Sequence, residues 1–399
     1  MATSSGAIGR RWTRAATRER DRTFRFGHPT VLITTTVLAL VTLGIVMILS
    51  ASSVSSFASN GSSFTFFKKQ LLWAAIGLLA FFVLSRFDYR RLKGVGYLAL
   101  PAVMAALVIV LIPGFGIVVG GSTRWIPLGP LAFQPSEVAK LALILFAADV
   151  FSRKDEQSFR ELSHTAVPMI PALGILAALV LLQPDLGTTL VLGSIGVGML
   201  FVAGAPLRHL IPIGLLGGSL AMAAGIMAPY RRERILAFMD PWQDPLGAGY
   251  HAIQSMIALG SGGLFGVGLG ASRQKWSYVP NAHTDFIYAI LGEEMGLLGT
   301  LTVLGLFAFL GYLGIRTARK APDRFGMLIA SGITVWIALQ ALVNMGAVTS
   351  SLPITGMPLP MVSFGGTSLV ITLAAVGILS NIARQGEDGP QRRAAARKR

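Results

Sequence analysis

Three acidic residues lie within ten positions, where a long polar loop meets a long apolar run: Asp285, Glu293 and Glu294. A carboxylate at the edge of hydrocarbon is costly to keep there, so it is a candidate functional group by default. Partial burial raises the pKa of a carboxyl group and makes the carboxylate a better general base. The alternative is structural, because the first turn of a helix favours acidic residues through the helix dipole.

A second group of chemically capable residues begins at Arg124 and Trp125. A cation beside an amphipathic ring suits a phosphate or pyrophosphate ligand, and it equally suits an anchor at the membrane interface. Glu137 and Lys140 follow at i,i+3 spacing inside an apolar run. Such a buried pair can neutralise itself, so it predicts either a structural ion pair or a binding site.

A glycine-rich segment, residues 260–270, precedes Arg273 and Lys275. It follows no predicted strand, which argues against a dinucleotide-binding loop. Glycines that allow close backbone approach, with basic residues and Asp285 nearby, fit an anionic lipid head group better.

Polar residues also occur inside or beside later apolar runs. Trp336, Gln340 and Asn344 share one helical face, where amides favour contacts between helices over ligand binding. His283 is a potential proton carrier beside Asp285, although an isolated histidine is more often structural, and its neighbours have no metal-ligand spacing.

Composition identifies the elements that must position these residues. The chain has 399 residues, of which 53% are hydrophobic and 13% charged, and its mean hydropathy is +0.65. These values predict a polytopic membrane protein. The absence of cysteine excludes disulfides and thiolate metal sites. The net charge of +16 indicates membrane topology and anionic membrane lipids, and no nucleic-acid-binding motif accompanies it.

Hydropathy predicts an all-α fold with about ten transmembrane helices. The apolar runs are 31–50, 71–84, 95–112, 138–150, 166–182, 188–203, 209–228, 286–314, 326–348 and 368–382. About three quarters of the 34 lysines and arginines fall on one side if both termini are cytoplasmic, which fixes the orientation.

Three longer connections then lie on the outer face: 114–135, 229–284 and 349–367. The largest joins the seventh and eighth helices. Residues 183–188 make a tight outer turn that contains Asp185, as proline and glycine dictate. The third connection is too rich in proline and glycine to begin as a helix, and such backbone is tolerated where it lines a cavity. Long loops in a compact bundle are usually functional.

Five motifs, in this order, resemble the SEDS family (shape, elongation, division and sporulation) of bacterial cell-wall glycan polymerases. They are Arg124-Trp-Ile with Phe133-Gln-Pro-Ser-Glu-Val-Ala-Lys140, Gln183-Pro-Asp-Leu-Gly-Thr188, the segment 260–275, the segment 282–296, and Leu352-Pro-Ile-Thr-Gly-Met-Pro-Leu-Pro with Ser363-Phe-Gly-Gly-Thr-Ser368. The resemblance covers residues 31–384. The segment 231–242 is more similar to the division-type members (FtsW) than to the elongation-type members (RodA).

This resemblance implies a peptidoglycan glycosyltransferase that polymerises lipid II on the outer face of the cytoplasmic membrane, at the division septum. The family's essential aspartate falls on Asp285, as base for the acceptor hydroxyl, with Arg124, Lys140 and Lys275 near the leaving pyrophosphate. The complete set of expected substrate-binding residues is Arg124, Trp125, Glu137, Lys140, Asp185, Lys275, Glu293, Asn344 and Ser363. No cofactor is implied, and whether a divalent cation assists is left open.

The implied partners are lipid II and its undecaprenyl-pyrophosphate-linked glycan product, a class B penicillin-binding protein that cross-links the strand, divisome proteins and membrane lipids, but no nucleic acid. The expected organisation is a disordered basic tail (1–29), the membrane domain (30–384) and a second basic tail (385–399). Competing functions are a lipid II flippase, an elongation-type polymerase and, from fold class alone, a secondary transporter. The transporter is disfavoured because no internal repeat is evident.

The placement of the two glutamates depends on where the eighth span begins. Residues 295–314 are long enough to span alone, which would leave Glu293 and Glu294 at the interface. If instead the helix runs on from Asp285, Glu293 lies about 80° from it around the helix and Glu294 on the opposite face. Only Glu293 could then share a cavity with Asp285.

Overall fold

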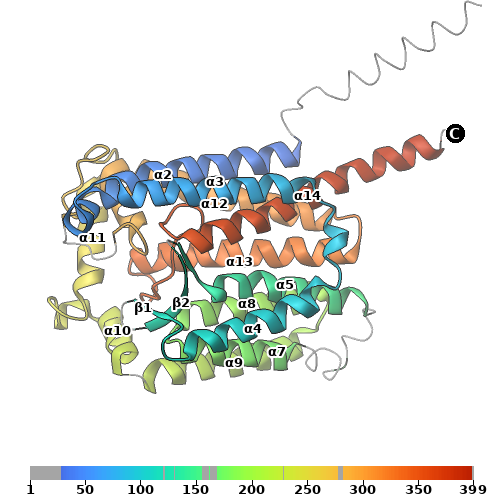
Figure 1. Ribbon diagram of the computed structural model, residues 1–399, viewed down its shortest axis with the longest axis horizontal. Coiled ribbons are helices and arrows are strands. Elements are labelled where there is room, and N and C mark those ends of the chain that lie inside the picture. The colour runs from blue at the N-terminus through green and yellow to red at the C-terminus, as the bar shows by residue number, and fades with distance from the viewer. Residues whose placement is uncertain are drawn as a thin grey trace, which may run out of the picture.

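The computed structural model describes residues 28–119, 122–129, 131–154, 161, 169–227, 229–276 and 282–397. The predicted basic tail at residues 1–29 falls almost entirely outside this range. Each of the ten predicted apolar runs corresponds to one helix: α2 (Pro29–Asn60), α3 (Thr65–Arg86), α4 (Val95–Leu111), α5 (Pro135–Ser152), α7 (Ile170–Leu182), α8 (Leu186–Ala203), α9 (Leu207–Met227), α12 (Ile287–Arg319), α13 (Arg324–Val348) and α14 (Gly366–Arg397). These helices lie side by side in one bundle (Figure 1).

Seven of these helices are long and apolar enough to cross a membrane: α2, α3, α8, α9, α12, α13 and α14. Helices α4 and α7 are shorter but apolar, and α5 carries Glu137, Lys140 and Asp149 within its 18 residues. The prediction of an all-α polytopic membrane protein is confirmed. Helix α14 continues as far as Arg397, so the segment predicted as a C-terminal tail begins within a helix.

The two ends of the bundle differ. The start of α2 and the end of α14 lie together at one end, and α10 (Pro229–Met239), α11 (Tyr250–Gly262) and the strands lie at the opposite end (Figure 1). The bias of basic residues toward the first end makes it the cytoplasmic one. The single-turn helices η1 (Tyr89–Leu92) and η3 (Pro241–Gln243) complete the connections.

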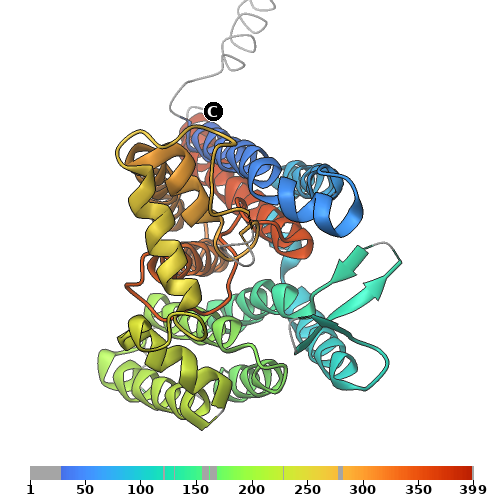
Figure 2. The ribbon, with the colours of Figure 1, turned by 90° about the vertical axis from the view of Figure 1, so that its left-hand side faces the viewer.

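A three-stranded antiparallel sheet, with strand order β1-β2-β3, occupies the loop between α4 and α5. Its strands are β1 (Ile117–Val119), β2 (Ser122–Leu128) and β3 (Leu131–Phe133). Figure 2 shows β1 and β2 extending away from the bundle. Sequence analysis did not predict these strands, because two of them have three residues each and glycine and proline interrupt the segment.

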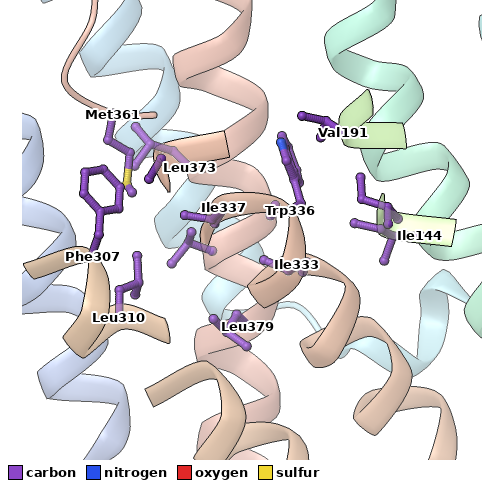
Figure 3. Close-up of a cluster of buried hydrophobic side chains, with 14 of the residues drawn as sticks. Ile144, Val191, Phe307, Leu310, Ile333, Trp336, Ile337, Met361, Leu373 and Leu379 are labelled. Atoms are coloured by element: carbon purple, nitrogen blue, oxygen red, sulfur yellow. The ribbon is translucent and has the colours of Figure 1, made fainter. Parts of the chain in front are cut away.

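Helix α13 occupies the centre of the bundle. Figure 3 shows Ile333, Trp336 and Ile337 of α13 between Ile144 of α5 and Val191 of α8 on one side and Phe307, Leu310, Leu373 and Leu379 of α12 and α14 on the other. Trp336 is 1% exposed. Because α5, α8, α12 and α14 all pack against α13, polar side chains on this helix are held in fixed positions.

Helix α12 is broken at Gly296, where φ is 67° and ψ is −163°. A Cβ at this position would lie 2.4 Å from the amide nitrogen of Gly266, so only glycine fits. The amides of Val267 and Gly268 donate to the carbonyls of Glu293 and Glu294 at 2.9 and 3.1 Å. The loop backbone thereby satisfies polar groups that lipid could not. Of the two alternatives left open for this span, the structure combines features of both: the helix begins at Ile287, and the break at Gly296 separates its first part from the remainder.

Candidate active site

Asp285 lies two residues before α12 begins, at the outer end of that helix. Its side chain is only partly exposed. Burial raises the pKa of the Asp285 carboxyl to about 6, against the opposing effect of the Arg234 and Arg124 guanidinium groups, and the charge of Asp185 raises it further. Ordinary carboxyl groups ionise near pH 4, so Asp285 is a stronger base than an exposed aspartate and is still mostly ionised at neutral pH.

Arg234 of α10 and Gly356 of the last outer loop meet at this carboxylate. Gly356 has a φ of 72°, and a Cβ there would lie 3.6 Å from Oδ2 of Asp285 and 4.0 Å from Nη1 of Arg234. Backbone without a side chain therefore faces both the candidate base and a cation. Glycine at this position keeps a side chain away from both groups.

Arg124 approaches from β2 and is fixed by the turn between α7 and α8. Its guanidinium donates to the carbonyls of Gln183 at 3.0 Å and Pro184 at 2.5 Å, and it lies 3.7 Å from Oδ2 of Asp185. Asp185 in turn caps α8 by accepting from the amide of Thr188 at 3.0 Å. The charges of Arg124 and Asp185 both act on the pKa of Asp285, so these two residues lie near it. Most donors of Arg124, however, are used by the turn.

Trp125, also predicted as a binding residue, is partly exposed and pairs with Ile117 across the sheet. His283 is stacked on Phe66 at a centroid distance of 4.7 Å and contacts Phe364 edge-on at 5.7 Å. Burial lowers the pKa of His283 to about 4. The ring is therefore neutral at physiological pH, and its aromatic contacts favour the structural interpretation over the proton carrier.

Glu137 and Lys140 form a buried ion pair, 3% and 1% exposed, with Nζ of Lys140 2.8 Å from Oε1 of Glu137. The ammonium also donates to Oε1 of Gln340 at 3.0 Å and lies 4.9 Å from the centroid of the Trp336 ring. These contacts enclose the charge. The pair was predicted to contact substrate. The structure places it within the packed bundle, where it contacts Gln340, one turn of α13 from the residue that binds the backbone of Asp285.

Lys275, Glu293 and Glu294 form a separate buried cluster. Glu294 accepts from the hydroxyl of Ser50 at 2.6 Å and lies 3.5 Å from the ammonium of Lys275. Glu293 accepts from the hydroxyl of Ser272 and from the amide of Arg273 at 2.9 Å. The cluster ties the loop after α11 to α2 and to the first part of α12, and none of its charges is among the groups that shift the pKa of Asp285.

Asn344 and Ser363 form hydrogen bonds with the backbone at and next to Asp285. The amide nitrogen of Asn344 donates to the carbonyl of Asp285 at 2.8 Å, and the hydroxyl of Ser363 donates to the carbonyl of Thr284 at 2.6 Å. Among the described residues, no group of three or more His, Asp or Glu side chains is arranged to hold a metal ion.

Arg234 and Gly356 were not among the predicted site residues. A signal for Arg234 was present, since it lies in a basic segment of the largest outer loop. Nothing in the sequence distinguished it from the neighbouring arginines, because only the course of α10 decides which one faces Asp285.

The fold and site define a polytopic membrane protein with a carboxylate of raised pKa between two guanidinium groups at its outer end. The family model described as "cell cycle protein" (FTSW_RODA_SPOVE) matches residues 30–388. The chain belongs to this family, and the SEDS resemblance inferred from its motifs is confirmed.

Named relatives agree with this assignment. Stage V sporulation protein E of Bacillus subtilis is 44% identical over 361 residues, which cover 89% of this chain and 97% of the relative. The probable peptidoglycan glycosyltransferase FtsW of Geobacter metallireducens is 40% identical over 353 residues, 88% of this chain and 94% of the relative.

Solved structures are similar over the same range. A chain from a study of the structural coordination of polymerization and crosslinking by a peptidoglycan synthase complex superimposes with a TM-score of 0.73, at 33% identity, covering 89% of this chain and 97% of that one. The rod shape determining protein RodA of Thermus thermophilus gives a TM-score of 0.65 at 30% identity, covering 88% and 96%.

Proposed function

We propose that this protein is a peptidoglycan glycosyltransferase that polymerises lipid II on the outer face of the cytoplasmic membrane, with Asp285 as the general base. The observation that carries the proposal is the carboxylate of raised pKa beside Arg234, Arg124 and Gly356. Relatives named as probable peptidoglycan glycosyltransferases, at about 40% identity over most of the chain, support the reaction class.

The reaction requires a base on one side of the donor sugar and positive charge on the other. Asp285 takes the proton of the acceptor 4-hydroxyl as that oxygen attacks C1 of the donor. The new glycosidic bond forms, the bond from C1 to the pyrophosphate oxygen breaks with inversion, and undecaprenyl pyrophosphate leaves with the electron pair. No separate acid is needed for so good a leaving group.

Arg234 and Arg124 are the cations placed to stabilise the leaving pyrophosphate. Guanidinium groups bind phosphate oxygens through two parallel donors. A fixed cation at a developing negative charge typically contributes about 10²- to 10³-fold in rate. The turn at Gln183 and Pro184 occupies donors of Arg124, so Arg124 stabilises the turn as well as the proposed leaving-group site.

The cellular role follows from the relatives. We assign the chain to cell-wall synthesis of the division or sporulation type, since the sporulation protein and FtsW proteins are 39–44% identical to it and the RodA structure 30%. A class B penicillin-binding protein is the proposed cross-linking partner, with the synthase complex as the precedent. Division-site proteins and membrane lipids complete the proposed partners, and the division septum is the proposed location.

The test is polymerisation of fluorescent lipid II by the purified protein with its cross-linking partner, with glycan length read on a gel. Asp285→Asn should abolish the product, and Glu233→Gln, a change at an exposed acid of α10, should not. Wild-type rates for Asp285→Asn would overturn the assignment of the base. Translocation of lipid II across liposomes without polymerisation, unaffected by Asp285→Asn, would favour the flippase.

A further inference from the structure

We propose that the buried Glu137–Lys140 pair, acting through Gln340, is a positioning device for Asp285 and does not contact substrate. The inference rests on the proposed function in one respect, the role of Asp285 as base. It reassigns two residues that the sequence pattern predicted to bind substrate.

The ammonium of Lys140 has no room for a pyrophosphate. It donates to Glu137 at 2.8 Å and Gln340 at 3.0 Å and lies against the ring of Trp336. Only 2% of the Lys140 side chain is exposed. Opening the site to a ligand would leave the Glu137 carboxylate buried without its partner, which is strongly unfavourable.

These contacts fix the orientation of the Gln340 side chain. Its oxygen accepts from Lys140 and, at 2.8 Å, from the ring nitrogen of Trp336. An amide whose oxygen is held by two donors must direct its nitrogen the other way. That nitrogen donates to the carbonyl of Pro358 at 3.0 Å.

One turn further along α13, the side chain of Asn344 repeats this contact. Its nitrogen donates to the carbonyl of Met357 at 2.7 Å and to the carbonyl of Asp285 at 2.8 Å. Two successive carbonyls of the last outer loop, at Met357 and Pro358, are therefore held by two successive turns of one buried helix. The upper turn also holds the backbone of the candidate base.

The same loop secures the other side of this backbone. The hydroxyl of Ser363 donates to the carbonyl of Thr284 and accepts from the amide of Leu359 at 2.8 Å, and the amide of Phe364 donates to the carbonyl of His283 at 2.9 Å. Gly356 directly precedes Met357 and faces Oδ2 of Asp285. Displacement of Met357 and Pro358 would therefore move the backbone of Asp285 and also Gly356, which faces its carboxylate.

The experiment compares Asn344→Leu and Gln340→Met with Asn381→Leu in the full-length protein with its cross-linking partner. Asn381 is a buried amide that also binds backbone, donating to the carbonyl of Ser85 at 2.9 Å, but it lies near the cytoplasmic end. Glu137→Leu/Lys140→Met is the fourth variant, because Lys140→Met alone would leave the Glu137 carboxylate buried without a partner.

We expect kcat for lipid II polymerisation to fall about 10- to 100-fold in Asn344→Leu and Gln340→Met, because a small displacement of a catalytic group has effects of this size. KM should stay within about twofold, since no substrate contact is removed. The double variant should lose kcat in the same way. Hydrogen exchange of residues 353–365 should be faster in these three variants and unchanged in Asn381→Leu.

A raised KM with an unchanged kcat would make these residues substrate contacts and overturn the proposal. Faster exchange of 353–365 without any loss of kcat would also overturn it, because the loop would then be held without positioning the base. The exchange measurement needs no activity. If Asp285→Asn retained activity, the proposed base would be wrong. Hydrogen exchange of residues 353–365 would still show whether Gln340 and Asn344 hold the loop.

Discussion

The region around Asp285 contacts Asn344 of α13, and the network at Lys140 contacts Gln340, one turn earlier and about 6 Å away along the helix axis. The two regions hold charge in opposite ways. At Lys140 the charges are enclosed and paired, and every donor contact is to protein. At Asp285 the side chains of Asp285, Arg124 and Arg234 stay partly exposed. The network at Lys140 is therefore enclosed by protein, whereas the charged groups at Asp285 remain partly accessible.

Lys275 belongs with Lys140 in this comparison. Both lysines are buried, at 7% and 1% exposed, and both ammonium groups lie beside glutamate carboxylates. The cluster at Lys275 fastens the loop that fills the break of α12, and the network at Lys140 fastens the loop beside Asp285. Lysine suits such enclosed pairs because its charge is compact, whereas the forked guanidinium of arginine suits a phosphate.

The largest expected difference between the two regions is in stability. Lys140→Met should reduce the free energy of unfolding by about 3–5 kcal/mol, because it leaves Glu137 buried and unpaired. Glu137→Leu/Lys140→Met should recover most of that loss. Thermal unfolding in detergent measures both, with Arg234→Ala as the partly exposed counterpart. An equal loss in Arg234→Ala would contradict the distinction between enclosed and open charges.

For kcat, the larger effect is expected in the partly exposed region at Asp285. Arg234→Ala is expected to lower kcat by about 10²- to 10³-fold, because it removes a cation from the developing negative charge of the leaving group. The matched control is Arg232→Ala, at an exposed position on the same helix. Initial rates of glycan formation give the result. Equal rates in the two variants would exclude Arg234 from the reaction.

The pH dependence should separate Arg234 from Lys275. The base works in its ionised form, so activity should fall about tenfold per pH unit below the pKa of Asp285, about 6. The Arg234 charge lowers that pKa. Arg234→Ala should therefore raise it and move the acid limb to higher pH, and Lys275→Met should leave the limb in place. Profiles of kcat/KM for these variants test both statements.

The sequence was sufficient for features that depend on local composition. The ten helices of the bundle follow from hydropathy, whereas α10 and α11 do not. Asp285 was recognisable as an acid at the boundary of an apolar run. The Glu137–Lys140 pair was recognisable from its spacing, but its contact with Gln340, 200 positions away, was not. The roles of Lys275 and Glu293 could not be predicted, because burial of their charges depends on partners 19 to 225 positions away in the chain. The selection of Arg234 over its neighbours likewise depends on how α10 packs.

The smallest expected effect distinguishes Gly356, which faces Asp285, from Gly61, which lies far from it in the chain and has no neighbour at its Cβ position. Gly356 and Gly61 have nearly equal φ values, 72° and 69°, but a Cβ at Gly61 would meet nothing within 4 Å. Alanine at either position should cost about 1 kcal/mol of stability, because its backbone is left-handed there. Only Gly356→Ala should also slow polymerisation several-fold, since its methyl group would lie 3.6 Å from Oδ2 of Asp285 and narrow the space for the acceptor hydroxyl. Matched unfolding curves with unequal kcat would support this space as the acceptor position, and equal kcat would exclude it.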